Sequence, residues 1–346
     1  MRIAQIAPPW FTVPPRHYGG IELVVALLAD GLEARGHEVT LFASGGSNTK
    51  AALVSPLEES PDPALLGNSW FDAFHALSAY LEIGRFDVVH DHSGIIGPAL
   101  GSMLGGTPPV VHTLHGPWTE ASRRFYSLID QRVHLVAISD TQRRDNLAIQ
   151  YAATVHNGID LALYPYQAEK EDFLVYVGRA NPDKGPTRAI EVARRAGLPL
   201  AMIVKKTEPF ERAYWEEIVA PMLTDDVEVY EAVSHEFKVD LLGRARAMVF
   251  PIDWAEPFGL VMIEAMACGT PVVTCPVGAA SEVVTEGVTG FLAESLDDLA
   301  AAVGEVDRCT PEACRADVEA RFSADRMVDA YEELLSAVAV PGSPSE

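Results

Sequence analysis

EPFGLVMIEAMACGTPVV, residues 256–273, contains two glutamates, Glu256 and Glu264, eight positions apart. A Pro-Phe-Gly turn follows Glu256, and the apolar residues after it predict a helix that contains Glu264 and leads to a strand at 271–275. Near the start of a helix, a carboxylate can stabilise the helix dipole. The same helix end can also bind an anionic ligand. The two glutamates therefore either stabilise the helix locally or hold a ligand, and residues elsewhere in the chain distinguish these roles.

Length and charge narrow the class of protein. The chain has 346 residues, enough for two domains, and 48% of them are hydrophobic, enough for two packed cores. The formal net charge of −23 argues against nucleic acid or an anionic membrane as the main partner, because both require basic patches. No apolar run reaches the roughly 18 residues that span a bilayer, and Pro8-Pro9 interrupts the N-terminal segment too early for a signal peptide. We expect a cytoplasmic protein without an integral membrane segment.

The candidates for a metal site are weak. His90 and His92 lie on one face of a predicted strand and His115 follows the next strand, with Asp91 nearby. No further acidic residue completes a recognisable metal-binding spacing, and no Asp-x-Asp pair occurs in the chain. The cysteines also lack the two-residue spacing of a zinc site, and we expect reduced thiols at Cys268, Cys275, Cys309 and Cys314. The sequence therefore predicts no bound metal.

Short apolar segments alternate with longer amphipathic ones, which is typical of parallel sheets covered by helices. Strands of a first series are expected at 2–7, 38–44, 87–92, 109–116 and 134–139, with a helix at 21–36. Strands of a second series are expected at 173–179, 200–204, 227–231, 247–251 and 271–275. The stretch between them, 155–172, has turn residues and charge but no sustained apolar period, so we place a domain boundary near residue 160. The sequence thus predicts an α/β fold of two facing, doubly wound, Rossmann-like domains.

Ligands of such sheets lie outside the carboxyl ends of the strands, and several notable residues follow strands. Gly19-Gly20 leads directly into a helix, where it is either a plain turn or a place for a phosphate to approach the backbone. Arg179 and Lys184 lie in the loop GRANPDKG after the first strand of the second series. They are either solvated surface charges or a pair that binds a diphosphate, and their position at a strand end favours the diphosphate.

The most basic part of the chain lies in the first domain. As a default interpretation, its arginines are exposed helix residues that pair with the surplus acids. A binding face for a negatively charged acceptor is the alternative. The residues are Arg123, Arg124, Arg132, Arg143 and Arg144.

Taken together, these motifs resemble those of the family 4 retaining glycosyltransferases. The resemblance covers nearly the whole chain and is most specific in Glu256, Phe258-Gly259-Leu260 and Glu264, which fit the E-x7-E signature of that family. GRANPDKG resembles its diphosphate loop. HYGGIE (17–22), VVHTLHG (110–116) and VHNGID (155–160) resemble its glycine loop, its active-site histidine segment and its interdomain segment. The family has the GT-B architecture of two facing α/β domains and uses nucleotide-sugar donors.

The resemblance implies roles for several residues of the segment 256–264. Glu256 would contact hydroxyls of the donor sugar, and Glu264 would hold the ribose of the nucleotide. The backbone amides of Phe258, Gly259 and Leu260 would lie near the sugar and the diphosphate.

It also implies how the reaction proceeds without a metal or a cofactor. Arg179, Lys184 and the helix dipole would stabilise the leaving diphosphate. His115 would contact the donor sugar, and Gly19 and Gly20 would belong to the donor-binding set. The catalytic residues expected on this basis are His115, Glu256, Arg179 and Lys184.

The resemblance further implies a separate binding role for each domain. Residues 1–160 would form the acceptor-side domain and 161–322 the nucleotide-sugar-binding domain, while 323–346 would be a terminal helix that crosses back to the first domain, followed by a short tail. The chain departs from the family after the strand at 200–204, where Lys205-Lys206-Thr207 replaces a Gly-x-Gly turn. A lysine there either adds a phosphate contact or marks a loop of different shape.

Two other classes stay open. A sugar-nucleotide epimerase of the same architecture would bind a similar donor, and a non-catalytic nucleotide-sugar-binding protein would keep the donor pocket alone. For a transferase, a UDP-sugar is favoured and a GDP-sugar is the alternative. The acidic composition favours a soluble small molecule or glycan over a lipid as acceptor, and the sequence does not specify the acceptor or the oligomeric state.

Overall fold

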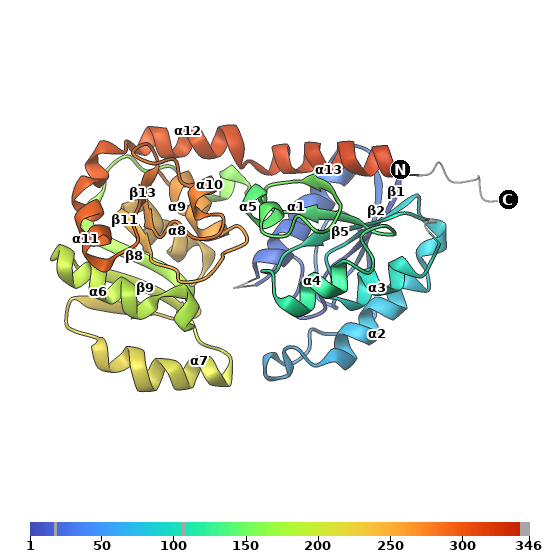
Figure 1. The fold of residues 1–346 in the computed structure, drawn as a ribbon, viewed down its shortest axis with the longest axis horizontal. Helices are drawn as coiled ribbons and strands as arrows, with labels where there is room; N and C mark the ends of the chain where they lie inside the picture. The colour runs from blue at the N-terminus through green and yellow to red at the C-terminus, as the bar shows by residue number, and fades with distance from the viewer. Residues whose placement is uncertain (17–18, 106–107, 340–346) are drawn as a thin grey trace. The chain divides into compact units, whose positions relative to one another are not determined.

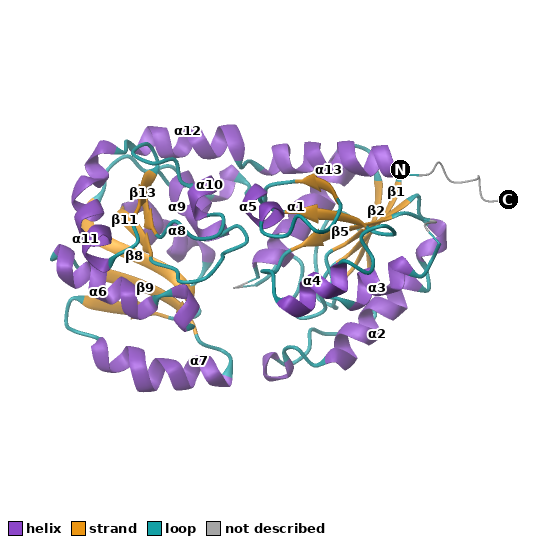
Figure 2. Cartoon of the chain, viewed as in Figure 1, coloured by secondary structure: helices purple, strands orange, loops and turns teal. Residues whose placement is uncertain are grey.

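The computed structural model describes residues 1–16, 19–105 and 108–339, and the chain divides into two compact units. Unit 1 comprises Met1–Gly158 together with Ala324–Glu346, and unit 2 comprises Ile159–Ser323. Each unit contains a sheet of parallel strands with helices packed around it (Figures 1 and 2). The predicted class, an α/β fold with two parallel-sheet domains, is confirmed.

The sheet of unit 1 has the strand order β3-β2-β1-β4-β5-β6-β7. Its inner strands are almost wholly buried because helices cover them, which explains their continuous apolar sequences. The strands are β1 (Arg2–Ile6), β2 (Glu38–Phe42), β3 (Ala52–Val54), β4 (Val88–Asp91), β5 (Val110–Leu114), β6 (His134–Ala137) and β7 (Tyr151–Thr154). The helices are α1 (Gly20–Ala34), α2 (Ser69–Tyr80), α3 (Ile96–Ser102), α4 (Glu120–Tyr126), α5 (Asp140–Arg144) and α13 (Ala324–Val338).

The sheet of unit 2 has the order β10-β9-β8-β11-β12-β13. Its strands are β8 (Glu171–Arg179), β9 (Leu200–Lys205), β10 (Val227–Tyr230), β11 (Ala245–Phe250), β12 (Val272–Thr274) and β13 (Gly290–Leu292). The helices are α6 (Pro186–Ala196), α7 (Pro209–Tyr214), α8 (His235–Arg244), α9 (Leu260–Ala267), α10 (Ala280–Val283), α11 (Leu296–Glu305) and α12 (Pro311–Arg321).

Both sheets follow the same winding rule. In each, the chain builds outward from a first strand to one edge, then returns to the other side of that strand and builds toward the opposite edge. The order reverses between β1 and β4 in unit 1 and between β8 and β11 in unit 2. Ligands of doubly wound sheets bind at the carboxyl ends of the strands at this point of reversal. The fold therefore directs attention to the loops after β1, β4, β8 and β11.

The sequence analysis does not predict three edge strands. They are β3, β7 and β13, each of three or four residues. An edge strand pairs with only one neighbour, and β3 and β7 are largely exposed or half-buried, so neither has a detectable apolar period. These strands extend sheets whose central strands are predicted correctly.

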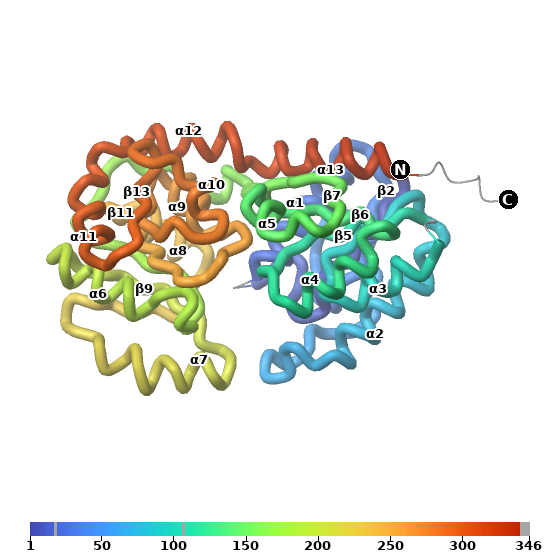
Figure 3. The backbone as a smooth tube through the Cα atoms, viewed as in Figure 1, coloured from blue at the N-terminus to red at the C-terminus, as the bar shows by residue number. Residues whose placement is uncertain are grey.

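The last helix belongs to unit 1, although it follows the last segment of unit 2 in sequence (Figure 3). α13 packs on α1, where Arg35 forms ion pairs with Asp329 and Glu332. Gly31 allows the close approach, because a Cβ at this position would lie 2.6 Å from a methyl group of Val328. Two segments at opposite ends of the sequence thereby close one unit.

Candidate active site

Arg179 and Lys184 lie at the point of reversal in unit 2. Arg179 is the last residue of β8, and a single 3-10 turn, Pro182–Lys184, leads from it to α6. Gly185 links this turn to the helix with a φ of +70°. A Cβ on Gly185 would lie 2.2 Å from the carbonyl oxygen of Pro251, so the glycine lets the loop after β8 lie against the loop after β11.

Lys184 and Glu256 form an ion pair across these two loops. The indole Nε1 of Trp254 donates a hydrogen bond of 3.0 Å to the same Glu256 oxygen. The Lys184 ammonium lies 4.1 Å from the centre of the Trp254 ring, within the range of a cation–π contact. The lysine and glutamate side chains are only 16% and 11% exposed, so water screens their attraction weakly. The predicted cation and the predicted sugar-binding glutamate thus lie in direct contact.

Arg179 has two acidic partners that the sequence analysis does not identify. Its Nη2 donates to Glu208 and its Nε donates to Glu211. Glu211 is wholly buried, whereas 19% of the Glu208 side chain is exposed. The sequence does contain a signal for them, because Glu208-Pro209 followed by Glu211 has the spacing of a helix capping box at the carboxyl end of β9.

Glu264 is held inside α9 by two further residues that the sequence analysis does not identify. Its Oε1 accepts hydrogen bonds of 2.8 Å from the Tyr164 hydroxyl and the Lys238 ammonium. Burial raises the pKa of Glu264, but the charge of Lys238 and these hydrogen bonds outweigh burial and leave the pKa below its ordinary value. The carboxylate is therefore ionised at neutral pH. Its other oxygen, Oε2, is buried and has no hydrogen-bond partner among the described residues.

The start of α9 has no side-chain cap. Its N-cap is Gly259, in a left-handed conformation with φ +85°. Glu256 contacts Lys184 and Trp254 instead of capping the helix. The first backbone amides of a helix have no intrahelical acceptor, so this end of α9 can receive an anion.

The loop after β12 fixes the backbone of Glu256. The amide of Ala279 donates a hydrogen bond of 2.8 Å to the Glu256 carbonyl. Gly278, with φ +57°, packs so closely that a Cβ would lie 2.3 Å from the Glu256 nitrogen. The loops after β8, β11 and β12 therefore converge on Glu256, with the loop after β12 contacting its backbone.

In unit 1, the predicted histidine follows β5 and contacts another histidine that follows β4. His115 Nε2 and His92 Nδ1 are 2.9 Å apart and share one hydrogen bond. His90 packs against His92 and bonds to Thr113 at 3.0 Å, and Thr113 in turn bonds to the Tyr331 hydroxyl of α13 at 2.8 Å. Three hydrogen bonds and one ring contact, that between His90 and His92, thus connect α13 to the strand ends.

His90, His92 and His115 are neutral at physiological pH. Burial, followed by repulsion from neighbouring histidines, lowers the pKa of both His90 and His115 to about 3. It also lowers the pKa of His92 well below its ordinary value, with the same causes. His115 can therefore donate or accept a hydrogen bond but does not carry a positive charge into the site.

The glycine pair lies at the N-terminus of α1. Gly19 is the N-cap and Gly20 is the first helical residue. Because Gly19 has no side chain, it cannot cap the first backbone amides of the helix. His17 and Tyr18, the first residues of the HYGGIE motif, lie outside the described residues. Gly19 also packs tightly, because a Cβ there would lie 2.7 Å from both Pro15 and the Glu22 carboxylate.

The basic residues of α4 and α5 contact groups of their own unit. Arg124 pairs with Glu120, and Arg123 donates to the backbone carbonyl of Asp145. Arg123 and Arg143 also lie over aromatic rings, those of Trp118 and Tyr151. These contacts agree with the default interpretation of helix-surface arginines.

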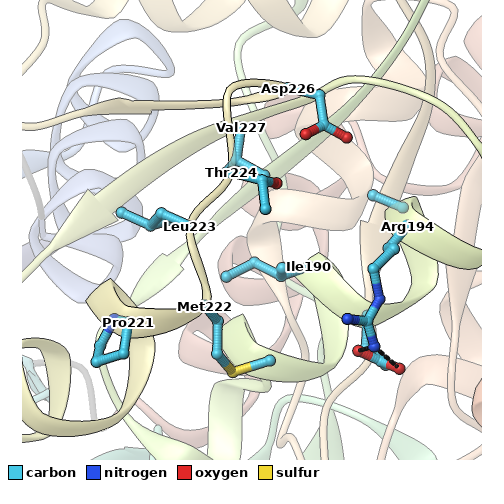
Figure 4. Close-up of a pocket in the computed structure, with 10 residues that line it drawn as sticks. Ile190, Arg194, Pro221, Met222, Leu223, Thr224, Asp226 and Val227 are labelled. Carbon is cyan, nitrogen blue, oxygen red and sulfur yellow. Dashed lines mark hydrogen bonds and ion pairs between the residues drawn. The ribbon is translucent and has the colours of Figure 1, made fainter.

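A pocket of about 340 Å³ lies elsewhere in unit 2 (Figure 4). It is lined by part of α6 and by the residues just before β10, at the amino end of that strand. None of the predicted site residues is among its lining residues, which are Ile190, Glu191, Ala193, Arg194, Pro221, Met222, Leu223, Thr224, Asp226 and Val227. Ligands of this fold bind at the carboxyl ends of strands, where Arg179 and Glu256 lie and this pocket does not.

Within the described parts of the chain, no three acidic, histidine or cysteine side chains are grouped so as to hold a metal ion. All four cysteines are buried free thiols. No helix in those parts is long and apolar enough to cross a membrane.

Two family models match the chain in succession. The model described as "Glycosyltransferase Family 4" matches residues 18–163, and the model described as "Glycosyl transferases group 1" matches residues 165–317. The boundary between the two matches falls close to the boundary between units 1 and 2.

Curated relatives are glycosyltransferases. The chain is 27% identical over 332 residues to the D-inositol 3-phosphate glycosyltransferase of Pseudarthrobacter chlorophenolicus, covering 80% of this chain and 78% of the relative. It is 29% identical, over an alignment 369 residues long, to the glycogen synthase of Mycobacterium tuberculosis. The match covers 88% of this chain and 86% of the relative.

Solved structures agree in fold. A glycosyltransferase involved in avilamycin A biosynthesis is 26% identical, with a TM-score of 0.73 and 98% of both chains covered. Sucrose-phosphate synthase from Thermosynechococcus elongatus is 21% identical, with a TM-score of 0.79, covering 97% of this chain and all of the other. Anabaena HepE in complex with UDP-glucose is 20% identical, with a TM-score of 0.76 and the same coverage.

The two parallel sheets and these matches define an enzyme of the glycosyltransferase class with the GT-B architecture. Within that class, the chain belongs to the family 4 glycosyltransferases.

The buried neutral histidines predict loss of stability in acid. A histidine whose pKa falls from 6.5 to about 3 on folding favours the folded state fully above pH 6.5, and this contribution is lost as the pH falls toward 3. Each such histidine adds about 1.4 kcal/mol per pH unit to the slope of the free energy of unfolding. Replacement His90→Gln, which cannot be protonated, should reduce the slope by that amount between pH 6 and 4, as measured by urea unfolding. An unchanged slope would contradict the assignment of His90 as a neutral buried group.

Proposed function

We propose that the chain is a retaining hexosyltransferase that moves a sugar from a nucleotide-sugar donor to an acceptor hydroxyl without a metal ion. A UDP-sugar is favoured as donor, since Anabaena HepE, which shares the fold, was crystallised with UDP-glucose. A GDP-sugar is the alternative. Unit 2 would bind the nucleotide sugar and unit 1 the acceptor.

The observation that carries this proposal is the unpartnered oxygen of Glu264. Oε1 is satisfied by Tyr164 and Lys238, whereas Oε2 is buried without a hydrogen-bond donor. A buried carboxylate oxygen without a partner is costly in free energy. Ribose hydroxyls of the donor would supply the missing hydrogen bonds.

The remaining groups of unit 2 suit the rest of a nucleotide sugar. Arg179, Lys184 and the uncapped start of α9 provide positive charge for a diphosphate. Phe258, Gly259 and Leu260 would contribute backbone amides there. Because Glu256 touches Lys184, it would receive the sugar attached to that diphosphate. Negative charge that develops on the leaving diphosphate would be stabilised by cations already in place.

In unit 1, His115 would contact the donor sugar. Its low pKa keeps the imidazole neutral, and its bond to His92 fixes the orientation of the ring. Gly19 and Gly20 would let the backbone approach the donor at the start of α1.

For the acceptor we favour a soluble small molecule or a glycan over a lipid, because the net charge of −23 opposes an anionic membrane surface. With this acceptor we also propose a cytoplasmic location.

Incubation with UDP-glucose alone separates the proposal from its rivals. A transferase should slowly release UDP, as water takes the place of the acceptor. Formation of an epimerised sugar nucleotide would instead indicate an epimerase. Binding without either product, in the presence of a panel of acceptors, would indicate a nucleotide-sugar-binding protein. Product analysis by liquid chromatography and mass spectrometry distinguishes these outcomes.

Replacement of Glu264 and of Glu256 by glutamine should impair different properties of the enzyme. Glu264→Gln should weaken binding of both the sugar nucleotide and bare UDP, because it loses a charge-assisted bond of about 1.5–3 kcal/mol to the ribose. Glu256→Gln should leave the affinity for UDP nearly intact and reduce transfer, because UDP lacks the sugar. Calorimetry with UDP, transfer rates and melting temperatures of both variants test this pair of expectations. If both variants only have lower melting temperatures, corresponding to a loss of about 0.5–2 kcal/mol each in the free energy of unfolding, and their activity is unchanged, the glutamates are helix stabilisers.

Activity should persist in EDTA, since Arg179 and Lys184 can neutralise the diphosphate without a metal. The measurement is UDP release with and without the chelator, using enzyme that has been dialysed against it. Loss of activity with rescue by manganese or magnesium would contradict this expectation and redirect attention to Asp91 and the histidines around it.

A further inference from the structure

Arg179 faces more negative charge than it can neutralise. Its single positive charge contacts two carboxylates, Glu208 through Nη2 and Glu211 through Nε. Lys184 is likewise paired with Glu256. These two cations and three carboxylates carry a net charge of −1 between them, and Lys205 lies beside Arg179 in the sheet register. A diphosphate that binds Arg179 through Nη2 would therefore have to displace a carboxylate.

Glu211 is the carboxylate that stays. It is wholly buried, and besides Arg179 its Oε2 accepts the backbone amide of Glu208 at 3.0 Å. These two bonds fix the Arg179 Nε to the first turn of α7. Withdrawal of Glu211 would leave a buried guanidinium nitrogen and a helix amide without partners, which is costly.

Glu208 is the carboxylate that can leave. It lies at the N-cap of α7, and its side chain is partly exposed. An exposed carboxylate regains water when it swings away, whereas a buried one does not.

The loop that carries Glu208 is the one in which this chain departs from its family. Lys205, Lys206 and Thr207 directly precede Glu208, at the position where the sequence analysis finds a departure from the resemblance. The Lys206 ammonium is bound elsewhere, at 2.9 Å from Glu231 and 4.9 Å from the centre of the Trp215 ring. We therefore assign the charge that this loop adds at Arg179 to Glu208.

From these contacts we propose that Glu208 is an internal competitor for the diphosphate, and that Glu211 is a positioning residue that holds Arg179 ready for it. The inference rests on the proposed function, because it takes Arg179 as a ligand of the donor diphosphate. On binding, the phosphate oxygens replace Glu208 at Arg179 Nη2 while Glu211 keeps Nε in place. Glu208 thereby sets how much negative charge a ligand must bring, and the site selects nucleoside diphosphates over monophosphates.

Three glutamine variants and two ligands test this inference, with UDP and UMP as calorimetric probes of the full chain. Glu208→Gln should tighten UDP binding by about 3- to 10-fold, because the competitor loses its charge, and should change UMP binding by less than about 2-fold. Glu211→Gln should weaken UDP binding by about 10-fold and again spare UMP. Glu217→Gln, an exposed glutamate in the segment after α7, removes the same charge without touching Arg179 and should leave both affinities unchanged.

Further measurements distinguish failure of this inference from failure of the proposed function. Adding Arg179→Ala to the Glu208→Gln variant should abolish the gain in UDP affinity, since the competition takes place at that guanidinium. An equal change for UDP and UMP, or weaker UDP binding by Glu208→Gln, would show that the two glutamates only shape the loop and would overturn the inference. If Arg179→Ala alone binds UDP normally, the diphosphate assignment of the proposed function fails, and the inference fails with it. If Arg179→Ala weakens UDP binding but Glu208→Gln has no effect, the inference alone is overturned.

Discussion

The ion pair between Lys184 and Glu256 is the contact on which the arrangement of unit 2 depends. It joins the loops after β8 and β11, the two strands between which the order of the sheet reverses. Gly185 and Gly278 have no side chains, and this lets the surrounding backbone close around the pair. A larger residue at either glycine would separate the loops and leave a largely buried charge without its partner, which costs more than the pair contributes when intact.

Pairing of opposite charges is found for both candidate cations of unit 2. Each predicted cation has an acidic partner in the donor-free chain, Lys184 with Glu256 and Arg179 with Glu208 and Glu211. Preorganised cations cost little rearrangement when charge develops on a leaving group. If the donor diphosphate binds at these cations, as we propose, they would exchange protein carboxylates for phosphate oxygens. In a chain with a net charge of −23, that exchange would weigh on the affinity for an anionic donor.

The positions of the candidate site residues at strand ends follow from the sequence, because parallel strands bring their carboxyl ends to one edge of a sheet. Arg179, Lys184 and Glu256 follow predicted strands, and the structure brings them together. The partners that tune them were not accessible in the same way. The capping-box spacing marks Glu211 as part of a helix start, but it does not show the contact with Arg179, 32 positions earlier. Tyr164 likewise reaches Glu264 from 100 positions away. Such pairs depend on how loops fold onto each other, and no local periodicity encodes them.

Unit 1 shows a related dependence on distant sequence. The polar chain behind His115 passes through His92, His90 and Thr113 and ends at Tyr331, which is contributed by the last helix. Tyr331 is fully buried, and its ring also lies 4.5 Å from that of His90. Tyr331 thus supports His90 through Thr113 and through ring packing, His90 packs against His92, and the hydrogen bond with His92 orients the His115 ring. The terminal helix is therefore part of the support of the site, as well as the element that closes the unit.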